Sequence, residues 1–420
     1  MSVSIHHGDI VFCESADALS VTEGGYLVAE NGFVAGIYPV LPEQYAGAPV
    51  TEHGRGVLIP AFSDLHIHAS QFVQRGIGMD KLLFDWLNDY TFPQESRFAD
   101  MDYAGAVYDA MADELLRCGT FHAALFTTVH YDATDHLFRA LEERGIHAYV
   151  GKVNQDMNSA GTLQETTEDS LRQTERFLAE HPAGKTVRPI LVPRFAPTCS
   201  DALLSGLGKL AAKYGVGVHT HLVESRAEAQ FALDTHPGCS CDAEIYQKHG
   251  LLDHGPAIFA HVIFPTPRDA EIIRSVNAMT VHCPESTTNI TAGIMPVKAM
   301  RERGFRVSLG TDVGGCQSAR VFSQAARAVQ LSKLREFYAP EESGRLTFAN
   351  AFYLATAAGG ALFDRVGSLA PGYRFNALVI DGLEDAFAPL SPAERLERFC
   401  YAGDDRNIVK RYLNGTEINI

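Results

Sequence analysis

The stretch DLHIH, residues 64–68, follows an apolar run at 57–62 that is typical of a buried strand. Side chains alternate between the two sides of a strand, so His66 and His68 point the same way. Burying two imidazoles together costs free energy unless something binds them. A divalent metal is the usual partner, because neutral imidazole donates a lone pair at short range. The stretch therefore predicts a metal site at the end of a strand.

Short apolar, β-branched runs alternate with amphipathic helical patterns along the chain. The expected strands are 57–66, 120–128, 146–153, 187–194, 215–222, 257–263, 278–283 and 306–312. The expected helices include 103–117, 134–144, 167–180, 201–213 and 296–303. This alternation indicates an α/β fold, a TIM-like (β/α)8 barrel. An open doubly wound sheet is the competing interpretation, but the Gly-rich phosphate turn that usually follows its first strand is absent.

The two ends of the chain each contain a hairpin pattern. Asn31-Gly32 and Asn414-Gly415 separate short apolar runs, and Asn-Gly pairs accept the positive φ angles of two-residue hairpin turns. Together with residues 376–381 they predict a small β-sandwich built from both termini. We therefore expect residues 1–56 and 369–420 to form the sandwich and residues 57–368 to form a catalytic barrel.

Composition limits the classes of partner. The 420 residues carry a formal net charge of −16, which argues against nucleic-acid binding, and a small neutral substrate is the easier partner. The sequence has no run long enough to span a membrane, and its N-terminus lacks the apolar core of a signal peptide. The eight cysteines are scattered, as in reduced cytoplasmic proteins. We expect a cytoplasmic protein without a membrane partner.

Ionisable residues gather where the expected strands end, which is where barrel enzymes place their chemistry. They are His66, His68, Arg194, His219, His221, Glu224, His261, His282 and Asp312. A His-x-His pair with a third histidine and an aspartate can form a catalytic metal site that leaves a position for water. Zinc suits three nitrogens and one oxygen, and iron or manganese would also accept them.

Glu224 and Arg194 have the chemistry of a proton carrier and of a substrate anchor. Glu224 follows His221 closely enough to reach a metal-bound water, and a carboxylate can pass its proton to a substrate nitrogen. Arg194 offers a two-pronged donor to a purine carbonyl and ring nitrogen. The structural alternatives are that Glu224 is the first-turn acid of a helix and that Arg194 pairs with a carboxylate.

Three further rim residues keep open assignments at this point. Asp312 could cap the helix that follows, although its position opposite the histidine pair favours a ligand role. His219 and His282 receive no metal role, since an isolated strand-end histidine more often bonds a backbone carbonyl.

With these motifs assembled, the chain resembles the amidohydrolase superfamily, and within it the guanine deaminases, nearly end to end. The stretches that carry the resemblance are DLHIHASQ (64–71), WLNDYTFPQESRF (86–98), GKV (151–153), TTEDSLRQTERF (166–177), PRF (193–195), HLVE (221–224), HCP (282–284), GTDVG (310–314) and GDDRNI (403–408). The first is common across the superfamily. The YTFP segment and the PRF triplet are particular to the guanine-specific branch.

The resemblance implies one catalytic metal per subunit, normally Zn²⁺ with Fe²⁺ as the alternative. Its ligands would be His66, His68, His221 and Asp312. The residues given catalytic roles are Glu224, which would relay protons, His261, which would polarise the site or hold the attacking hydroxide, and Asp312. The family also tends to form homodimers, which we expect here.

The resemblance implies that the small-molecule partner is a purine. Gln71 and Arg194 would hydrogen-bond to its edge and Phe195 would stack on it, and His68, His221, Glu224 and Asp312 would also face it. The implied reaction is hydrolytic deamination of guanine to xanthine and ammonia, by addition of hydroxide at the carbon that bears the exocyclic amine.

Other functions remain open. The runner-up is a related aminohydrolase that acts on 8-oxoguanine, a pterin or a triazine. A two-metal cyclic-amide hydrolase is disfavoured because the fourth expected strand has no bridging lysine. A nucleic-acid deaminase lacks its His-x-Glu and Pro-Cys-x-x-Cys ligands. A non-catalytic metal scaffold has no use for the carboxylate of Glu224.

Overall fold

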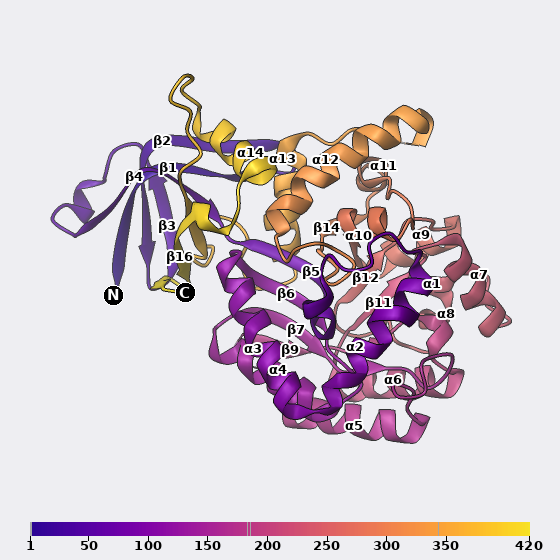
Figure 1. Ribbon diagram of the computed structural model, residues 1–420. Coiled ribbons are helices and arrows are strands. Elements are labelled where there is room, and N and C mark those ends of the chain that lie inside the picture. Colours follow the sequence, from indigo (N-terminus) through magenta and orange to yellow (C-terminus); the bar gives the residue numbers. More distant parts are fainter. Residues whose placement is uncertain (1, 183, 185, 343) are drawn as a thin grey trace.

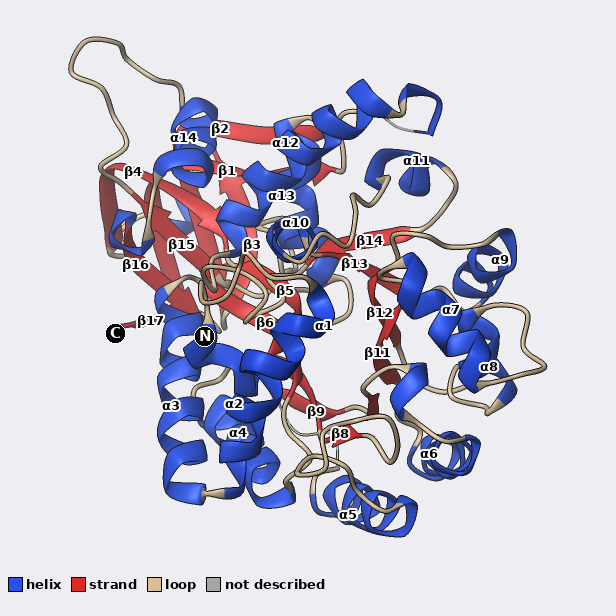
Figure 2. Ribbon diagram, turned by 45° about the vertical axis from the view of Figure 1, so that its right-hand side comes forward, coloured by secondary structure: helices blue, strands red, loops and turns tan. Residues whose placement is uncertain are grey.

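The computed structural model describes residues 2–182, 184, 186–342 and 344–420. Figure 1 shows that the two ends of the chain, indigo and yellow, lie side by side in one layer of strands. The middle of the chain forms a rounded body next to it. In Figure 2 the strands of this body lie inside and helices surround them.

The rounded body is a closed barrel of parallel strands, which confirms the predicted fold class. Its strands are β5 (Phe62–His68), β6 (Thr120–Phe126), β7 (His147–Gly151), β9 (Val187–Pro189), β11 (Val218–Leu222), β12 (Ala257–His261), β13 (Met279–His282) and β14 (Arg306–Leu309). They form two four-stranded parallel sheets, one in the order β5-β6-β7-β9 and one in the order β11-β12-β13-β14.

Two connections close these sheets into a barrel. On one side, Leu191 forms a parallel bridge with Val218. The short strands β8 (Val153–Asn154) and β10 (Val192–Pro193) pair beside it. On the other side, the His68 N–H donates to the Val313 carbonyl at 2.7 Å, and the Asp312 N–H donates to the His66 carbonyl at 2.8 Å. The second connection joins the two segments that carry three of the predicted metal ligands.

Helices cover the barrel, and those expected at 103–117, 134–144, 167–180, 201–213 and 296–303 are present. Those after the barrel strands are α3 (Met101–Arg117), α4 (Tyr131–Glu143), α5 (Thr167–Glu180), α6 (Asp201–Tyr214), α7 (Arg226–Thr235), α8 (Asp242–Lys248), α9 (Pro267–Ser275), α10 (Pro284–Asn289), α11 (Val297–Glu302), α12 (Val321–Tyr338) and α13 (Phe348–Tyr353). Side-chain oxygens fix several starts: Thr166 caps α5 and Ser200 caps α6, whose end is marked by Gly215 at φ 67°. No helix in the described part of the chain is long and apolar enough to cross a membrane.

The strand expected at 57–66 is two strands, and this expectation was wrong. β4 (Val50–Pro60) belongs to the terminal sheet, where its last residues pair antiparallel with β15 (Ala377–Ile380). β5 starts at Phe62 and pairs with β6. The apolar residues of this run are buried in both β4 and β5. Hydrophobicity alone therefore does not show where the chain passes from the terminal sheet to the barrel.

The terminal segments form one seven-stranded sheet in the order β17-β16-β15-β4-β1-β2-β3. Its remaining members are β1 (Val3–Ser15), β2 (Ala18–Glu30), β3 (Phe33–Tyr38), β16 (Ile408–Leu413) and β17 (Thr416–Ile418), with α14 (Pro392–Ala402) between β15 and β16. Both hairpins are confirmed, with φ of 51° and 80° at Asn31 and Gly32, and of 52° and 83° at Asn414 and Gly415. The domain limits at 56/57 and 368/369 stay a prediction.

Buried polar contacts join the terminal sheet to the barrel. Asn376, fully buried, donates from its amide to His122 Nε2 at 3.0 Å and accepts the Asn414 N–H at 2.7 Å. His122, on β6, also contacts the hydroxyl of Ser63 on β5 at 3.1 Å. One amide therefore connects the second hairpin turn to the core of the barrel.

We expect Asn376→Ala to lower the free energy of unfolding by about 1–3 kcal/mol for each group left buried without a partner, here His122 Nε2 and the Asn414 N–H. Urea unfolding followed by circular dichroism measures the change. Gln164→Ala removes an exposed amide and serves as the control, with an expected change of less than about 0.5 kcal/mol. Equal stability of the two variants would contradict the assigned connection.

Candidate active site

The barrel mouth contains a pocket at the carboxyl ends of its strands. Polar walls come from β5, β11, β12 and the loop after β14, and an apolar wall comes from the segment around α1 (Leu83–Trp86). Most of the residues that the sequence assigned to metal, substrate or catalysis line this pocket: His68, Gln71, Arg194, Phe195, His221, Glu224, His261 and Asp312. His66 lies directly beneath, with no solvent exposure.

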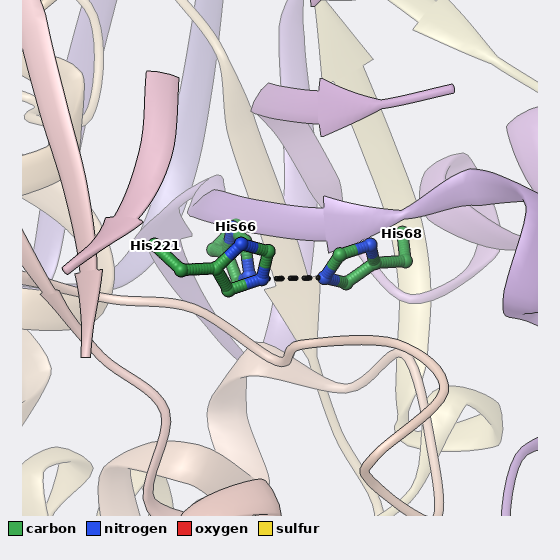
Figure 3. A group of neighbouring side chains, drawn as sticks. All are labelled: His66, His68 and His221. Atoms are coloured by element: carbon green, nitrogen blue, oxygen red, sulfur yellow. Dashed lines mark hydrogen bonds between the residues drawn. The ribbon is translucent and has the colours of Figure 1, made fainter. Parts of the chain in front are cut away.

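The four predicted metal ligands converge. Figure 3 shows His66, His68 and His221 directed at one another from β5 and β11, with the Nε2 atoms of His68 and His221 3.0 Å apart. Asp312 Oδ1 lies 3.3 Å from the Nε2 atoms of both His66 and His68. Residues far apart in the sequence thus present three ring nitrogens and one carboxylate oxygen to a single point.

Contacts on the far side of two rings fix which nitrogen faces this point. His221 Nδ1 is 2.6 Å from the Arg194 carbonyl oxygen, so this nitrogen carries the hydrogen and Nε2 keeps its lone pair. His66 Nδ1 is 3.0 Å from His219 Nε2, and donation from His66 leaves its own Nε2 lone pair free. His66 Nε2 is buried and has no hydrogen-bond partner among the described residues.

Ionisation states favour a bound cation. Burial opposes ionisation of Asp312, but the adjacent His66 and His68 rings outweigh it and hold the pKa of Asp312 well below its usual range. Burial lowers the pKa of His66, and burial together with the neighbouring rings lowers that of His221 further. At neutral pH the site therefore presents an anionic Asp312 carboxylate and neutral His66 and His221 rings, which are the forms that bind metal.

The donor set fits a first-row divalent metal. Ligand atoms of His66, His68 and His221 lie within 4.8 Å of one another, as do those of His66, His261 and Asp312. Imidazole nitrogens with one carboxylate oxygen suit zinc or iron better than calcium or magnesium. An orphaned, fully buried ring nitrogen at the centre is the observation that an ion would explain.

Contacts behind Asp312 hold its carboxylate in place. Ser286, on α10, donates to Oδ2 at 2.5 Å. The preceding residue, Thr311, donates its backbone N–H at 2.9 Å and its hydroxyl at 2.5 Å to the buried carboxylate of Asp64. Asp312 itself has φ 54°, a left-handed conformation that is rare outside glycine. The loop that presents this ligand is therefore strained and held by hydrogen bonds.

Glu224 and His261 lie next to the metal-ligand cluster. His261 Nε2 is 3.4 Å from Glu224 Oε1 and 3.9 Å from Asp312 Oδ2. Burial and the charges of Glu228 and Asp312 raise the pKa of Glu224 well above its usual value, so its carboxyl group holds a proton readily. Burial lowers the pKa of His261 to about 3. The pair thus combines a proton-carrying acid with a neutral imidazole.

Arg194 and Gln71 are connected through a carboxylate that the sequence reasoning missed. Glu95, on α2 (Phe92–Ser96), accepts from Arg194 Nη1 at 2.6 Å and from Gln71 Nε2 at 2.8 Å, and all three side chains are buried. Gln71 Oε1 accepts the Gly314 N–H at 3.3 Å. Phe195 extends the same wall, with its ring centre 6.4 Å from that of His221.

Glu95, His219 and Glu228 are the functional neighbours that the motifs left unassigned. Glu95 lies within the quoted WLNDYTFPQESRF stretch. An acidic residue among several aromatic residues there was a sequence signal for a buried polar role. His219 supports His66 from below, and Glu228 accepts the Glu224 N–H at 2.6 Å. His282, on β13, is buried and stays without a role.

Comparison with known proteins places the chain in a class. The sequence profile of the amidohydrolase family matches residues 57–418. The chain therefore belongs to the amidohydrolase family.

Within this family, several relatives that match most of the chain are guanine deaminases. The protein of Dictyostelium discoideum with that name is 32% identical over 379 residues, which cover 88% of this chain and 84% of that protein. Guanine deaminase of Escherichia coli is 30% identical over 416 residues, 96% of this chain and 92% of that protein. The crystal structure of guanine deaminase from C. acetobutylicum with guanine bound in its active site superposes with a TM-score of 0.96 at 39% identity, over 100% of both chains.

We expect His219→Ala to weaken divalent-metal binding about 10- to 100-fold, because loss of a partner behind a ligand leaves that ligand free to rotate. His219→Gln restores a hydrogen-bond partner for His66 and should recover part of the affinity. Dialysis against graded chelator, followed by elemental analysis, measures the metal that is retained. His136→Ala, on the outer side of α4, is the control, and retention by His219→Ala equal to that of the control would rule out the supporting role.

Proposed function

We propose that this protein hydrolyses guanine to xanthine and ammonia. The observation that carries the proposal is the convergence of His66, His68, His221 and Asp312 beside the buried carboxyl group of Glu224. A purine-binding wall formed by Arg194, Gln71 and Phe195 faces the same pocket. The similarity to guanine deaminases over nearly the whole chain supports the same substrate.

The proposed cofactor is one divalent metal ion per chain, zinc in the first instance and iron as the alternative. His66, His68, His221 and Asp312 would hold it. Such an ion supplies Lewis acidity, which makes water a nucleophile at neutral pH. The remaining chemistry, proton transfer and substrate placement, belongs to the side chains around it.

Glu224 is the proposed proton carrier. A carboxyl group with a raised pKa can take a proton from the attacking water and deliver it to the ring nitrogen next to the amine-bearing carbon. A second proton, taken from the hydroxyl group of the adduct and delivered to the exocyclic nitrogen, lets that nitrogen leave as ammonia while the new carbonyl forms. His261, 3.4 Å from Glu224, is placed to orient the nucleophile, because its neutral ring can donate or accept a hydrogen bond.

Arg194 and Gln71 are the proposed specificity residues. One edge of guanine carries two acceptors, the carbonyl oxygen and the adjacent imidazole nitrogen, and a guanidinium matches such a pair with two donors. Glu95 pairs with Arg194 and so compensates its charge, which suits an uncharged substrate. Phe195 would stack on the ring, and His68, His221, Glu224 and Asp312 would surround the amine-bearing side.

Two further properties are part of the proposal. A homodimer follows from the family resemblance. A cytoplasmic location is supported by composition, since each of the eight cysteines is a free thiol in the structure.

A panel of substrates tests the proposal. Metal-loaded protein is assayed for ammonia release with guanine, 8-oxoguanine, a pterin and a triazine, and guanine is expected to give the highest kcat/KM. Faster turnover of one of the other three would transfer the assignment to that aminohydrolase. Removal of the metal with chelator should abolish activity, and added Zn²⁺ should restore it.

We expect Glu224→Gln to lower kcat by about 10²- to 10⁴-fold, because the amide cannot carry the proton. The metal content should stay that of the wild type, because Glu224 is not among the proposed ligands. Glu271→Gln, an exposed glutamate on α9, is the matched control and should keep full activity. A Glu224→Gln protein that keeps wild-type turnover would show that another group moves the proton.

A further inference from the structure

A second group of potential ligands lies outside the barrel mouth. Asp201 begins α6, His236 directly follows α7, and His249 directly follows α8. These three helices cover the same side of the barrel in Figure 2. None of the three residues lines the active-site pocket, and no step proposed above uses them.

The His236 ring lies between two hydrogen-bond acceptors. Its side chain is only 2% exposed, and its Nε2 lies 2.9 Å from the Ala196 carbonyl oxygen, which can only accept. That nitrogen must therefore carry the hydrogen. The other nitrogen, Nδ1, is 2.7 Å from Asp201 Oδ1, again an acceptor. A neutral ring would place two lone pairs against each other, so either a proton or a metal ion must lie between them.

His249 presents a second ring nitrogen to the same oxygen. Its Nε2 is 3.2 Å from Asp201 Oδ1, and its side chain is 6% exposed. Its Nδ1 is 2.8 Å from the Ser205 hydroxyl, on the second turn of α6. In each histidine one ring nitrogen therefore contacts Asp201 and the other is held by a hydrogen-bond partner. Metal-binding histidines commonly have their second nitrogen held in this way.

We propose that Asp201, His236 and His249 form a second divalent-metal site. Their ligand atoms lie within 4.8 Å of one another. Two imidazoles and one carboxylate favour zinc, cobalt, nickel or copper over magnesium or calcium. Asp201 has a side chain that is 58% exposed, so water can complete the coordination and the ion can exchange with solution.

Lys248 is the one cation recorded beside this cluster in the described part of the chain. Its Nζ lies 3.6 Å from Asp201 Oδ2, the oxygen that faces away from both histidines, and its side chain is 45% exposed. The ammonium group can therefore stay in solvent while Oδ1 binds an ion. Its charge would weaken the site relative to the buried one at the barrel mouth.

An ion at this site would connect the outer helices to the active-site wall. The Ala196 carbonyl that accepts from His236 comes immediately after Arg194 and Phe195. Fixing His236 to Asp201 therefore restrains the short segment that presents those two residues, together with the start of α6. The site acts on positioning and not on the reacting atoms.

Metal stoichiometry tests the proposal independently of any activity. Wild type and variants are dialysed against a series of free Zn²⁺ concentrations and the ions per chain are measured by elemental analysis. Wild type should bind one ion per chain more than Asp201→Asn or His249→Gln, and this difference does not depend on how fully the barrel-mouth site is occupied. Ser205→Ala removes the partner of His249 Nδ1 and should weaken binding of that additional ion about 10- to 100-fold.

Asp253→Asn is the matched control, because Asp253 is an exposed carboxylate beside His249 in the same surface depression. It should bind the additional ion like wild type. Retention of the barrel-mouth ion by the Asp201 and His249 variants verifies that they are folded. The proposal is overturned if all variants bind as many ions as wild type at millimolar free zinc, or if Asp253→Asn loses the ion as fully as Asp201→Asn does.

Discussion

The structure depends on one electrostatic constraint: several uncharged imidazoles and a carboxylate are buried together with their acceptor atoms facing one another. The Nε2 lone pair that His66 keeps lies 3.3 Å from Asp312 Oδ1, and two such acceptors repel unless a positive charge lies between them. The groups around them enforce this arrangement. The Arg194 carbonyl, His219 and Ser286 each occupy the far side of a ligand and so prevent it from turning away. The core of the protein holds these groups in a geometry that suits a bound cation.

Backbone strain accompanies that geometry. Val223, His261, Val262 and Asp312 have φ of 44°, 69°, 51° and 54°, and each lies at or shortly after the carboxyl end of a barrel strand. For β-branched valines these angles are true outliers, and such strain persists only where the surroundings determine it. Here they do: the Val223 N–H donates to the buried Asp242 carboxylate at 3.1 Å, and the Val262 N–H donates to the Leu222 carbonyl at 3.0 Å. Glu224 and His261 owe their positions to these turns.

Much of this was predictable from local pattern, and the failures have physical reasons. Strand and helix periodicity located the barrel, and Asn-Gly turns located both terminal hairpins. The run at 57–66 misled because apolar residues report burial but not the identity of the neighbouring strand, so the change from β4 to β5 at Pro60–Phe62 was invisible. Glu95 was missed, and His219 was noted but given no role, because their contacts are with residues 24 and 153 positions away. Only the fold brings such pairs together.

The terminal sheet has a consequence for the order in which the chain can fold. β4 lies between β1 and β15, and the two Asn-Gly turns meet at Phe375, which accepts the Gly415 N–H at 3.0 Å and donates to the Gly32 carbonyl at 2.8 Å. During synthesis β4 must wait, with one edge unpaired, until β15 leaves the ribosome. Pairings between such distant segments form slowly, and open edges invite association with other chains. The nascent protein is therefore most vulnerable to aggregation just before β15 emerges.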